Sequence, residues 1–226
     1  MNDQSYPVGD EVSPLHCVPP SHVILAGEFV SLRPIDVERD VNSLFEVSHG
    51  DAATERMWTY MNYGPFANEA GMQVWLEGCG RSTDPLFLAA HHHERDTAVG
   101  MVSFLNIVAD MRCVEVGNIW YGPALQRSKV NTECVYLMLR YVFDDLSYRR
   151  VEWKCDALNQ PSRNAALRLG FRFEGTFLQH MIIKGRNRDT AWYALLDHEW
   201  PRVKRNMETW LYQDDTASLR TLNDTP

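Results

Sequence analysis

The spacing of apolar residues along the chain predicts strands and helices in alternation. Short runs of β-branched and aromatic residues bounded by Gly, Pro, Asn or Asp predict strands, and apolar residues three or four positions apart behind a capping residue predict helices. The predicted strands are residues 29–33, 86–90, 98–108, 112–121, 150–155, 171–174, 177–183 and 190–196. The predicted helices are residues 35–49, 68–79, 130–146, 162–169 and 198–212, with Asp36 and Asn68 as caps of the first two.

The order of these elements predicts the fold class. A first half rich in hairpins is followed by a second half in which strands and helices alternate. This order predicts an α/β fold in which a mixed sheet carries helices on both faces. Ligands of such sheets tend to bind at strand ends where neighbouring connections part.

The composition bounds the domain organisation. The chain has 226 residues, of which 45% are hydrophobic, and this is enough for one buried core. Residues 1–21 are rich in proline and residues 214–226 are polar, so we expect both segments to be tails. No linker-like change of composition divides residues 22–213, which we expect to form a single domain.

Charge and cysteine content narrow the class of protein. A net charge of −8 argues against a nucleic-acid-binding protein. Five cysteines, an odd number without CxxC spacing, predict reduced thiols in an intracellular protein. The N-terminus lacks the apolar core of a signal peptide, and no apolar run is long enough to span a membrane. We therefore expect a cytoplasmic protein that binds neither nucleic acid nor membrane.

Three consecutive histidines, His91, His92 and His93, suggest a metal site at first sight. Neighbouring residues of a strand face opposite sides of the sheet, so three in a row do not converge on one ion. We interpret these histidines as the end of a hairpin, and we expect no metal.

The stretch GPALQRSKVNTECVYLMLRYVF, residues 122–143, carries the strongest chemical signal. A predicted strand enters a polar loop that contains Arg127 and Lys129, and the loop leads into a long apolar helix. The free N–H groups of a first helical turn bind phosphate groups well, and added cations strengthen such binding. Neither GxxxxGK[ST] nor GxGxxG is present. The alternative is that Arg127 and Lys129 are solvated charges and that Thr132 and Glu133 are ordinary first-turn residues.

Three sequence blocks occur in order between residues 29 and 210. The first is the loop at residues 126–133, QRSKVNTE; the second is RRVEWKCDALNQPSRNAALRLGFRFEG at residues 149–175; the third is RDTAWYALLDHEWP at residues 188–201. Together these blocks resemble the GCN5-related N-acetyltransferases (GNAT), in particular the RimJ/RimL-like branch. The resemblance implies a mostly antiparallel sheet that is splayed at the cofactor site.

The resemblance also implies the cofactor, acetyl-CoA, and the residues that bind it. The loop and helix start would hold the pyrophosphate, the strand before the loop would bind the pantetheine arm as an added strand, and Asn159 would contact that arm. The expected cofactor-binding residues are Ile119, Trp120, Tyr121, Gln126, Arg127, Ser128, Lys129, Val130, Asn131, Thr132, Asn159 and Ser162. Two positions depart from the family loop, since Lys129 stands where a Gly is usual and Asn131 stands where a Gly or Ala is usual.

Two residues are candidates for acid–base chemistry. Many family members carry a Tyr four residues before the Gly-Phe pair, and here that position is Ala166. Relatives in the branch therefore point to Ser162 as the group that protonates the CoA thiolate, with helix capping as the alternative role. Glu115 is the candidate general base, on the opposite strand face from Val114 and Val116, with a solvent-facing position as the alternative.

The stretch MWTYMNYGPF, residues 57–66, is aromatic and interrupted by Gly-Pro. In the family this region lines the acceptor side, so Trp58, Tyr60 and Tyr63 are candidate substrate-binding residues. The alternative is a cluster that packs in the core or beneath a loop.

These inferences combine into one expected function. The chain is expected to move an acetyl group from acetyl-CoA directly to a primary amine, either a protein N-terminus or a small molecule. One alternative is a catalytically weak CoA-binding module, and another is a transferase that uses a longer acyl-CoA. A homodimer through exposed strand edges stays open.

Overall fold

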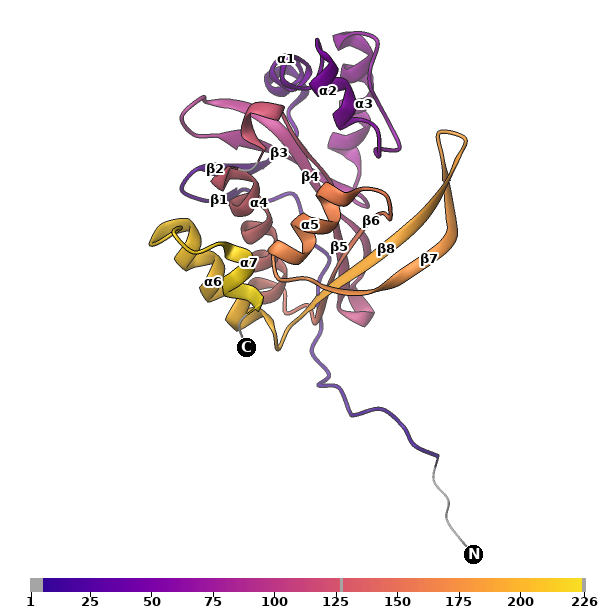
Figure 1. Ribbon diagram of the computed structural model, residues 1–226, viewed down its shortest axis with the longest axis vertical. Helices are drawn as coiled ribbons and strands as arrows, with labels where there is room; N and C mark the ends of the chain where they lie inside the picture. The colour runs from indigo at the N-terminus through magenta and orange to yellow at the C-terminus, as the bar shows by residue number, and fades with distance from the viewer. Residues whose placement is uncertain (1–5, 127, 225–226) are drawn as a thin grey trace, which may run out of the picture.

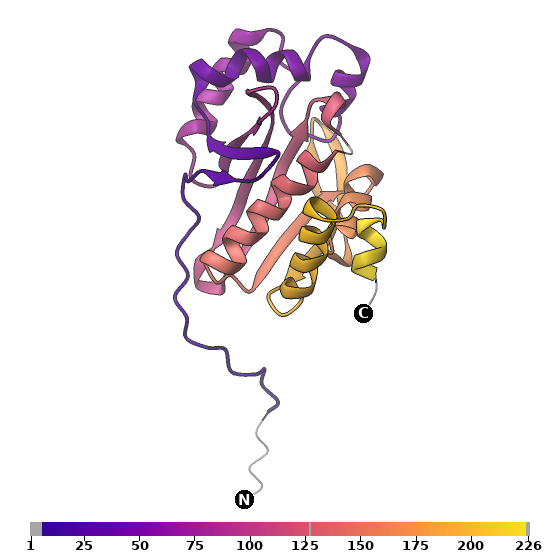
Figure 2. The same ribbon diagram turned by 90° about the vertical axis from the view of Figure 1, so that its left-hand side faces the viewer.

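The computed structural model describes residues 6–126 and 128–224. Its centre is a sheet of eight strands in the order β1-β2-β3-β4-β5-β6-β8-β7. Helices α1, α2 and α3 lie over one face, and α4 and α6 cross the other (Figures 1 and 2). The expected mixed α/β architecture with helices on both faces is therefore confirmed.

The strands pair in an antiparallel manner except at one place. Their bounds are β1 Leu25–Ala26, β2 Val30–Pro34, β3 Leu86–His92, β4 Thr97–Val108, β5 Cys113–Tyr121, β6 Arg150–Asp156, β7 Arg172–Ile183 and β8 Arg186–Leu196. The exception is the pair β5 and β6, which run parallel because α4 crosses between them.

Helices α1, α2, α3 and α5 begin at residues whose side chains cap the first turn. Their bounds are α1 Val37–Ser48, α2 Ala52–Met57, α3 Glu69–Arg81, α4 Lys129–Arg140, α5 Gln160–Arg168, α6 Trp200–Tyr212 and α7 Leu219–Asp224. The predicted caps Asp36 and Asn68 accept hydrogen bonds from the N–H groups of Arg39 and Gly71. The last turn of α4 continues as a π-helical turn, Tyr141–Asp145.

The structure differs from the sequence prediction in its short elements and at one cap. Helices α2 and α7 and strand β1 are too short to show a clear periodicity, and α7 lies where a polar tail was expected. The two strands predicted at 171–174 and 177–183 form the single bulged strand β7. Asn159, and not Ser162, caps α5: its Oδ1 accepts the N–H of Ser162, which therefore lies in the first turn.

The sheet separates two apolar clusters. Val114, Val116 and Leu137 belong to the cluster beneath α4, whereas Leu76 and Trp120 belong to the cluster beneath α1 and α3. Within the described residues, no helix has the length and apolar character needed to cross a bilayer.

Glu133 fastens the start of α4 to the rest of the fold. Its carboxylate is fully buried and accepts the N–H groups of Glu28, Phe29 and Val30 at 2.7, 2.7 and 2.8 Å. The hydroxyl of Tyr212, at the end of α6, donates to the same carboxylate at 2.7 Å. Because these donors satisfy the buried charge, the first turn of α4 is held rigidly between the β1–β2 turn and α6.

A second buried carboxylate, Asp40, joins α1 to the sheet. Its Oδ1 lies 2.9 Å from His91 Nε2 on β3 and 2.7 Å from Arg39 Nε, and its Oδ2 accepts the N–H of Asp36 at 3.0 Å. Burial opposes the charged form, but the hydrogen bonds from His91 and Arg39 prevail and lower the pKa of Asp40.

We expect Asp40→Ala to lower the free energy of unfolding by about 3 kcal/mol, because the change leaves buried donors without a partner. Since the pKa of Asp40 is lowered in the folded state, its contribution is present at neutral pH and disappears as the pH falls below about 4. Urea unfolding at pH 7 and at pH 3.5 measures both effects.

The exposed Glu46, on the same helix, provides the control, and Glu46→Ala should change stability by less than about 0.5 kcal/mol. An equal effect of the two substitutions at pH 7 would contradict the assigned role of Asp40.

Candidate active site

Strands β5 and β6 start together and then part. Their pairing covers three positions, Cys113 with Arg150, Val114 with Val151, and Glu115 with Glu152. Beyond Glu115, β5 continues to Tyr121 without pairing to β6, and β6 pairs only with β8. A wedge-shaped gap therefore opens in the middle of the sheet, with Glu115 at its narrow end.

A bulge in β5 accounts for the parting. Met101 of β4 pairs with Trp120 and Ser103 pairs with Gly117, so β5 carries one residue more than β4 over this interval. Asn118 in the bulge has φ of 50°, a conformation that Asn tolerates better than most residues, and its Nδ2 donates to Ser103 Oγ at 2.9 Å. The bulge turns the end of β5 away from β6.

The parting leaves one edge of β5 unpaired at residues 116–121. On the other edge these residues pair with β4, so the backbone groups that face β6 have no strand partner among the described residues. Trp120 and Tyr121 are both buried and point to opposite faces of the sheet, and Ile119 is half-buried. An extended ligand can add to this free edge as a strand does.

Glu115 is buried at the apex of the gap, with 5% of its surface exposed. Its Oε2 accepts a hydrogen bond from Asn106 Nδ2 at 2.6 Å and lies 2.9 Å from Lys154 Nζ. Its Oε1 has no hydrogen bond to the described residues. A side chain at Gly117 would come within 3.7 Å of this oxygen and would collide with Leu105, so the glycine keeps the approach to Oε1 open.

Burial sets the ionisation of this cluster. Desolvation raises the pKa of Glu115, and the nearby Lys154 opposes this shift only in part. Lys154 also contacts Glu152 at 2.8 Å, and these two carboxylates keep the pKa of Lys154 raised despite its burial. A carboxylate with a raised pKa and one free oxygen can accept a proton near neutral pH.

The start of α4 lies on the other face of the sheet and has no side-chain cap. Ser128 occupies the capping position, but its hydroxyl donates to the carbonyl of Leu125 at 2.6 Å. The first N–H groups of α4 therefore have no side-chain acceptor, in contrast to α1, α2, α3 and α5. Uncapped N–H groups at a helix start attract an anion.

The side chain of Lys129 points away from this helix start. Its Nζ donates to the carbonyl of Leu211 at 2.9 Å and lies 3.4 Å from Asp215. It also lies over the rings of Phe29 and Trp210. Lys129 therefore connects the start of α4 to the end of α6, and its charge pairs with the Asp215 carboxylate.

Arg168 is a cation at this site that the sequence analysis missed. Its Nη1 donates to Thr132 Oγ1 at 3.0 Å in α4, and its guanidinium lies over Trp210. Burial lowers the pKa of Arg168, and no carboxylate among the described residues pairs with it. The end of α5 and the start of α4 are 36 residues apart, so no local pattern could have revealed the contact.

The structure places the other predicted loop residues around the same helix start. Val130 and Thr132 are buried, and Asn131 is half-buried. Gln126 is exposed, and its Nε2 donates to the carbonyl of Tyr121 at 3.4 Å. Arg127 lies outside the described residues.

Ser162 lies beside β6 in the first turn of α5. Trp153 Nε1 donates to its Oγ at 3.0 Å, so the Ser162 hydroxyl hydrogen is available to a different acceptor, and the sulfur of Cys155 is one such acceptor. Burial raises the pKa of Cys155, and a hydrogen bond with Ser162 partly offsets this shift. All five cysteines are free thiols.

Only one of the three candidate aromatic residues in the 57–66 loop reaches across the gap. Trp58 is fully buried, donates from Nε1 to Ser48 O at 2.9 Å and packs on Trp120. Burial raises the pKa of Tyr63 well above its usual value. In contrast, the hydroxyl of Tyr60 donates to the carbonyl of Leu158, just after β6, at 3.2 Å. Packing, the alternative role, thus describes the observed contacts of Trp58 and Tyr63.

The turn between β7 and β8 contacts the 57–66 loop. Lys184 Nζ donates to the carbonyls of Trp58 and Gly64 at 3.0 and 2.7 Å. Figure 1 shows the tip of the β7–β8 hairpin extending toward the loop that follows α2. The 57–66 loop and the hairpin tip thus form two joined walls beside the gap, on the face of the sheet that carries Glu115.

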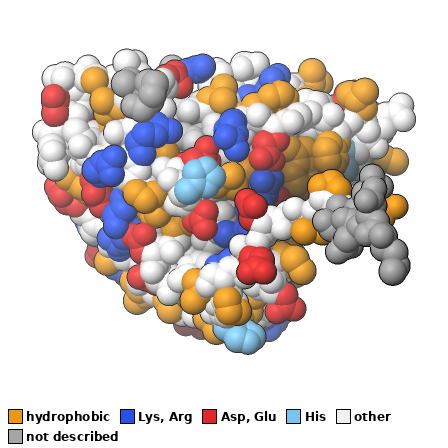
Figure 3. All heavy atoms as spheres, turned by 90° about the horizontal axis from the view of Figure 1, so that it is seen from below, with side chains coloured by type: hydrophobic (Ala, Val, Ile, Leu, Met, Phe, Trp, Pro, Cys, Tyr) orange, Lys and Arg blue, Asp and Glu red, His pale blue; other side chains and the backbone are white. Residues whose placement is uncertain are grey.

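The three histidines considered as metal ligands do not form one site. His91 contacts Asp40, His92 is partly exposed, and the ring of His93 lies between Ser31 Oγ and the Glu28 carbonyl. Among residues 6–126 and 128–224, no group of three His, Cys, Asp or Glu is arranged to hold a metal ion. On the face in Figure 3, Lys and Arg side chains lie interspersed with Asp and Glu.

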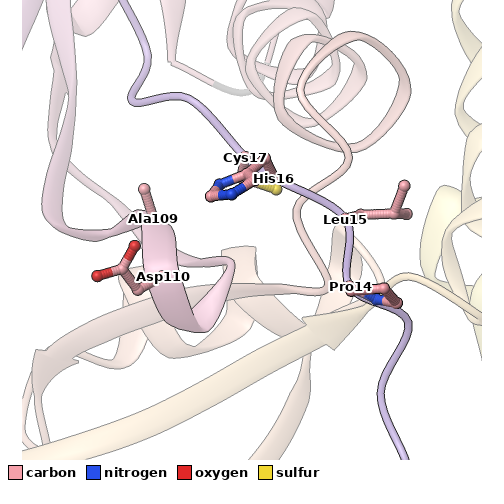
Figure 4. Close-up of a pocket in the computed structure, with 6 residues that line it drawn as sticks. All are labelled: Pro14, Leu15, His16, Cys17, Ala109 and Asp110. Carbon is pink, nitrogen blue, oxygen red and sulfur yellow. The ribbon is translucent and has the colours of Figure 1, made fainter.

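A hollow near the N-terminus is separate from the gap. It is lined by Pro14, Leu15, His16, Cys17, Ala109 and Asp110, as Figure 4 shows. Residues 109 and 110 precede the start of β5, whereas the gap opens toward the end of β5. The hollow therefore lies at the opposite end of the strand.

Comparisons with known proteins agree with this geometry. Residues 30–172 match the family model described as "Acetyltransferase (GNAT) domain". A crystal structure of a GCN5-related N-acetyltransferase from Brucella melitensis superposes with a TM-score of 0.89 at 37% identity and covers 92% of this chain and 97% of that chain. The crystal structure of the microcin C7 self immunity acetyltransferase MccE in complex with acetyl-CoA and AMP has a TM-score of 0.65 at 20% identity, covers 75% of this chain and 93% of that chain, and thus shares the fold.

A curated relative gives a similar result over a shorter region. "Putative ribosomal N-acetyltransferase YdaF" of Bacillus subtilis is 29% identical over 105 residues, which is 46% of this chain. The match covers 57% of the length of YdaF, less than two thirds of that protein.

We expect Lys129→Met to lower the free energy of unfolding by about 1 kcal/mol, because the Leu211 carbonyl loses a charged donor in a partly buried place. Arg205→Met, an exposed change of the same charge on α6, should alter stability by less than about 0.5 kcal/mol. Chemical denaturation of both variants measures the difference, and a neutral Lys129→Met would contradict the bridging role.

Proposed function

Because the chain belongs to the GNAT acetyltransferase family, we propose that it moves an acetyl group from acetyl-CoA directly to a primary amine. The observation that carries this proposal is the gap between β5 and β6, which has an uncapped helix start on one face and a carboxylate with a free oxygen on the other. The fold shared with MccE, which is described with acetyl-CoA bound, supports the choice of donor.

The residues around α4 fit the anionic part of the donor. Free N–H groups of residues 129–131 would bind the diphosphate, and Arg168 would add a cation that pairs with no carboxylate in the part of the chain that the structure describes. The free edge of β5 at residues 119–121 would pair with the amide-bearing arm. Asn159 already accepts the Ser162 N–H through Oδ1, so its Nδ2 is the group that could contact the arm.

Glu115 and Ser162 supply the proton transfers in this proposal. Acetyl-CoA provides the activated acyl group. Glu115 accepts a proton from the acceptor amine at Oε1, while Asn106 and Lys154 hold Oε2. Ser162, whose Oγ is held by Trp153, directs its hydroxyl hydrogen toward the departing sulfur. No Cys nucleophile is needed, and burial keeps Cys155 protonated.

The acceptor would enter beside the 57–66 loop. Tyr60 spans the gap there and is the residue of this loop best placed to touch an acceptor, while Trp58 and Tyr63 would support it from below. The RimJ/RimL-like resemblance, together with the name of YdaF, favours a protein N-terminus as one acceptor class. A non-catalytic CoA-binding module is less well supported, because such a module would not need a free carboxylate oxygen at the apex.

Association into a homodimer stays a prediction. The edge strand β7 exposes apolar side chains, among them Phe177 at 52%, Leu178 at 75% and Ile182 at 82%. A free strand edge with exposed apolar residues is a common dimer surface.

We expect Glu115→Gln to lower kcat by roughly 100-fold and Ser162→Ala by roughly 10-fold, because each removes one proton-transfer group. Binding of CoA, measured by calorimetry, should change by less than about threefold, since neither residue faces the diphosphate. Thiol release from acetyl-CoA over a panel of amines measures the rate, and the exposed Glu55→Gln is the control.

The pH profile offers a further test of Glu115. Its raised pKa means that the rate should fall as the pH drops through a value above the ordinary 4.5, and Glu115→Gln should lack this dependence. Full rates in both variants at every pH would contradict the two assignments.

We expect Arg168→Met to weaken CoA binding about tenfold, because a desolvated cation beside the helix start is lost. Lys129→Met should weaken it less than about threefold, because Nζ is engaged with Leu211. Calorimetric titration with CoA distinguishes the two, and a larger effect of Lys129→Met would contradict the assignment.

A further inference from the structure

Arg188 lies on the acceptor side of the gap, on strand β8. In the β6–β8 pairing Lys154 is opposite Trp192 and Asp156 is opposite Thr190, so Arg188 comes beside the chain that follows β6. Alternate residues of a strand share a face, which places the side chains of Arg188 and Trp192 on the face of Lys154. Lys154 lies 3.9 Å from the centre of the Trp192 ring and also contacts Glu115, so this is the face of the candidate base.

Two N–H donors of strand β8 on this face are buried and have no partner among the described residues. Arg188 Nε and Trp192 Nε1 are both inaccessible to solvent, and neither makes a hydrogen bond to any described residue. Leaving a buried donor unpaired is costly, and such groups in native proteins usually have a functional explanation. A ligand that brings an acceptor atom to this face would satisfy them.

The neighbouring carboxylates do not neutralise Arg188. Asp189 Oδ1 accepts hydrogen bonds from Gln179 N and Asn187 Nδ2, and Asp156 Oδ1 accepts the N–H of Leu158. No ion pair joins either of them to Arg188 among the described residues. Arg188 therefore has the charge and the free donors to bind an anion that the protein itself does not supply.

The end of the hairpin is basic although the chain as a whole is acidic. The segment HMIIKGRNRDT, residues 180–190, contains Lys184, Arg186 and Arg188 against the single carboxylate Asp189, in a chain of net charge −8. Lys184 already binds two carbonyls of the 57–66 loop, and Arg186 is exposed. Arg188 is the hairpin cation with a buried N–H donor that lacks a partner among the described residues. A cationic site inside an acidic protein selects for a negatively charged partner.

We propose that the amine acceptor carries a carboxylate and that Arg188 binds it, with Trp192 Nε1 as a second donor. This inference rests on the proposed acetyl transfer and names its substrate class. Ser162 lies beside Cys155, and Cys155 pairs with Ala191 of β8. Arg188 precedes Ala191 by three residues, so the two Cα atoms are about 10 Å apart along the strand. A carboxylate bound at Arg188 would therefore lie just beyond the end of β6. An acidic N-terminal peptide and a small amino acid both meet this condition.

The experiment uses two matched pairs of acceptors in the full-length protein with acetyl-CoA. One pair consists of hexapeptide mixtures with any first residue, followed by Glu-Asp-Glu-Ala-Ala or by Gln-Asn-Gln-Ala-Ala. The other pair is 4-aminobutyrate and butylamine. Thiol release gives kcat/KM for each, and the two pairs separate a peptide acceptor from a small one.

We expect the carboxylate-bearing member of at least one pair to have a kcat/KM at least tenfold higher than its neutral partner. Arg188→Gln should reduce this preference to less than twofold, mainly through a higher KM for the acidic acceptor. Arg186→Gln removes the same charge from an exposed position of the hairpin and should leave the preference intact. Equal rates for both members of each pair, or an undiminished preference in Arg188→Gln, would overturn the proposal.

Failure of the proposed function gives a different result. If no acceptor releases thiol, the proposed acetyl transfer is wrong for these amines, and calorimetric titration of the CoA-loaded protein with the acidic hexapeptide mixture decides the remaining question. Binding that Arg188→Gln weakens at least tenfold and Arg186→Gln does not would support the carboxylate site. Binding that is absent or insensitive to Arg188 would overturn it.

Discussion

The parting of β5 from β6 is the constraint on which the rest of this structure depends. Two parallel strands that stayed paired to their ends would close the sheet and leave no path between its faces. Pairing instead stops after Glu115 and Glu152, because the bulge at Asn118 turns β5 away. The backbone groups left unpaired raise the free energy of the protein without ligand. An extended ligand that pairs with them would restore the missing hydrogen bonds.

The two faces of the gap carry opposite chemistry. On the α4 face, the helix start has no side-chain cap, and no carboxylate among the described residues pairs with Arg168, so this face suits the negatively charged part of the proposed donor. On the other face, Glu115 is buried with a raised pKa and one free oxygen, so this face can remove a proton. The proposed transfer from a phosphate-bearing donor to an amine would need this separation, because a base placed among phosphate-binding cations would be held in ion pairs with them.

Buried carboxylates hold these parts in place. Near the start of α4, the Glu133 carboxylate accepts hydrogen bonds from three backbone N–H groups of the β1–β2 turn and from the hydroxyl of Tyr212. On the opposite face, the Asp40 carboxylate contacts the side chains of His91 and Arg39. Both oxygens of each carboxylate have partners within the protein, whereas no carboxylate in residues 6–126 and 128–224 pairs with Arg168 or Arg188. This contrast is why the two arginines, and not the two carboxylates, are the proposed ligand-binding charges.

The sequence by itself determined the features that depend on neighbouring residues. Alternation around Val114 and Val116 placed Glu115 on the opposite strand face, and the caps Asp36 and Asn68 located two helix starts. The anion site that the loop before α4 indicated stays a prediction. These features follow from backbone geometry within a few residues, which propensity and periodicity describe well. Ser162 was harder to place even locally, because Asn159 three residues earlier competes for the same cap.

Only the tertiary structure decided where the long polar side chains point. Lys129 reaches a carbonyl 82 residues away instead of the helix start beside it, Arg168 meets α4 across 36 residues, and Lys184 binds the loop that contains Trp58. Trp58 proved to be buried although its loop has the composition of an exposed one. A flexible side chain can turn in many directions at similar local cost, so its direction is chosen by partners that the folded chain brings near, and no local pattern contains that information.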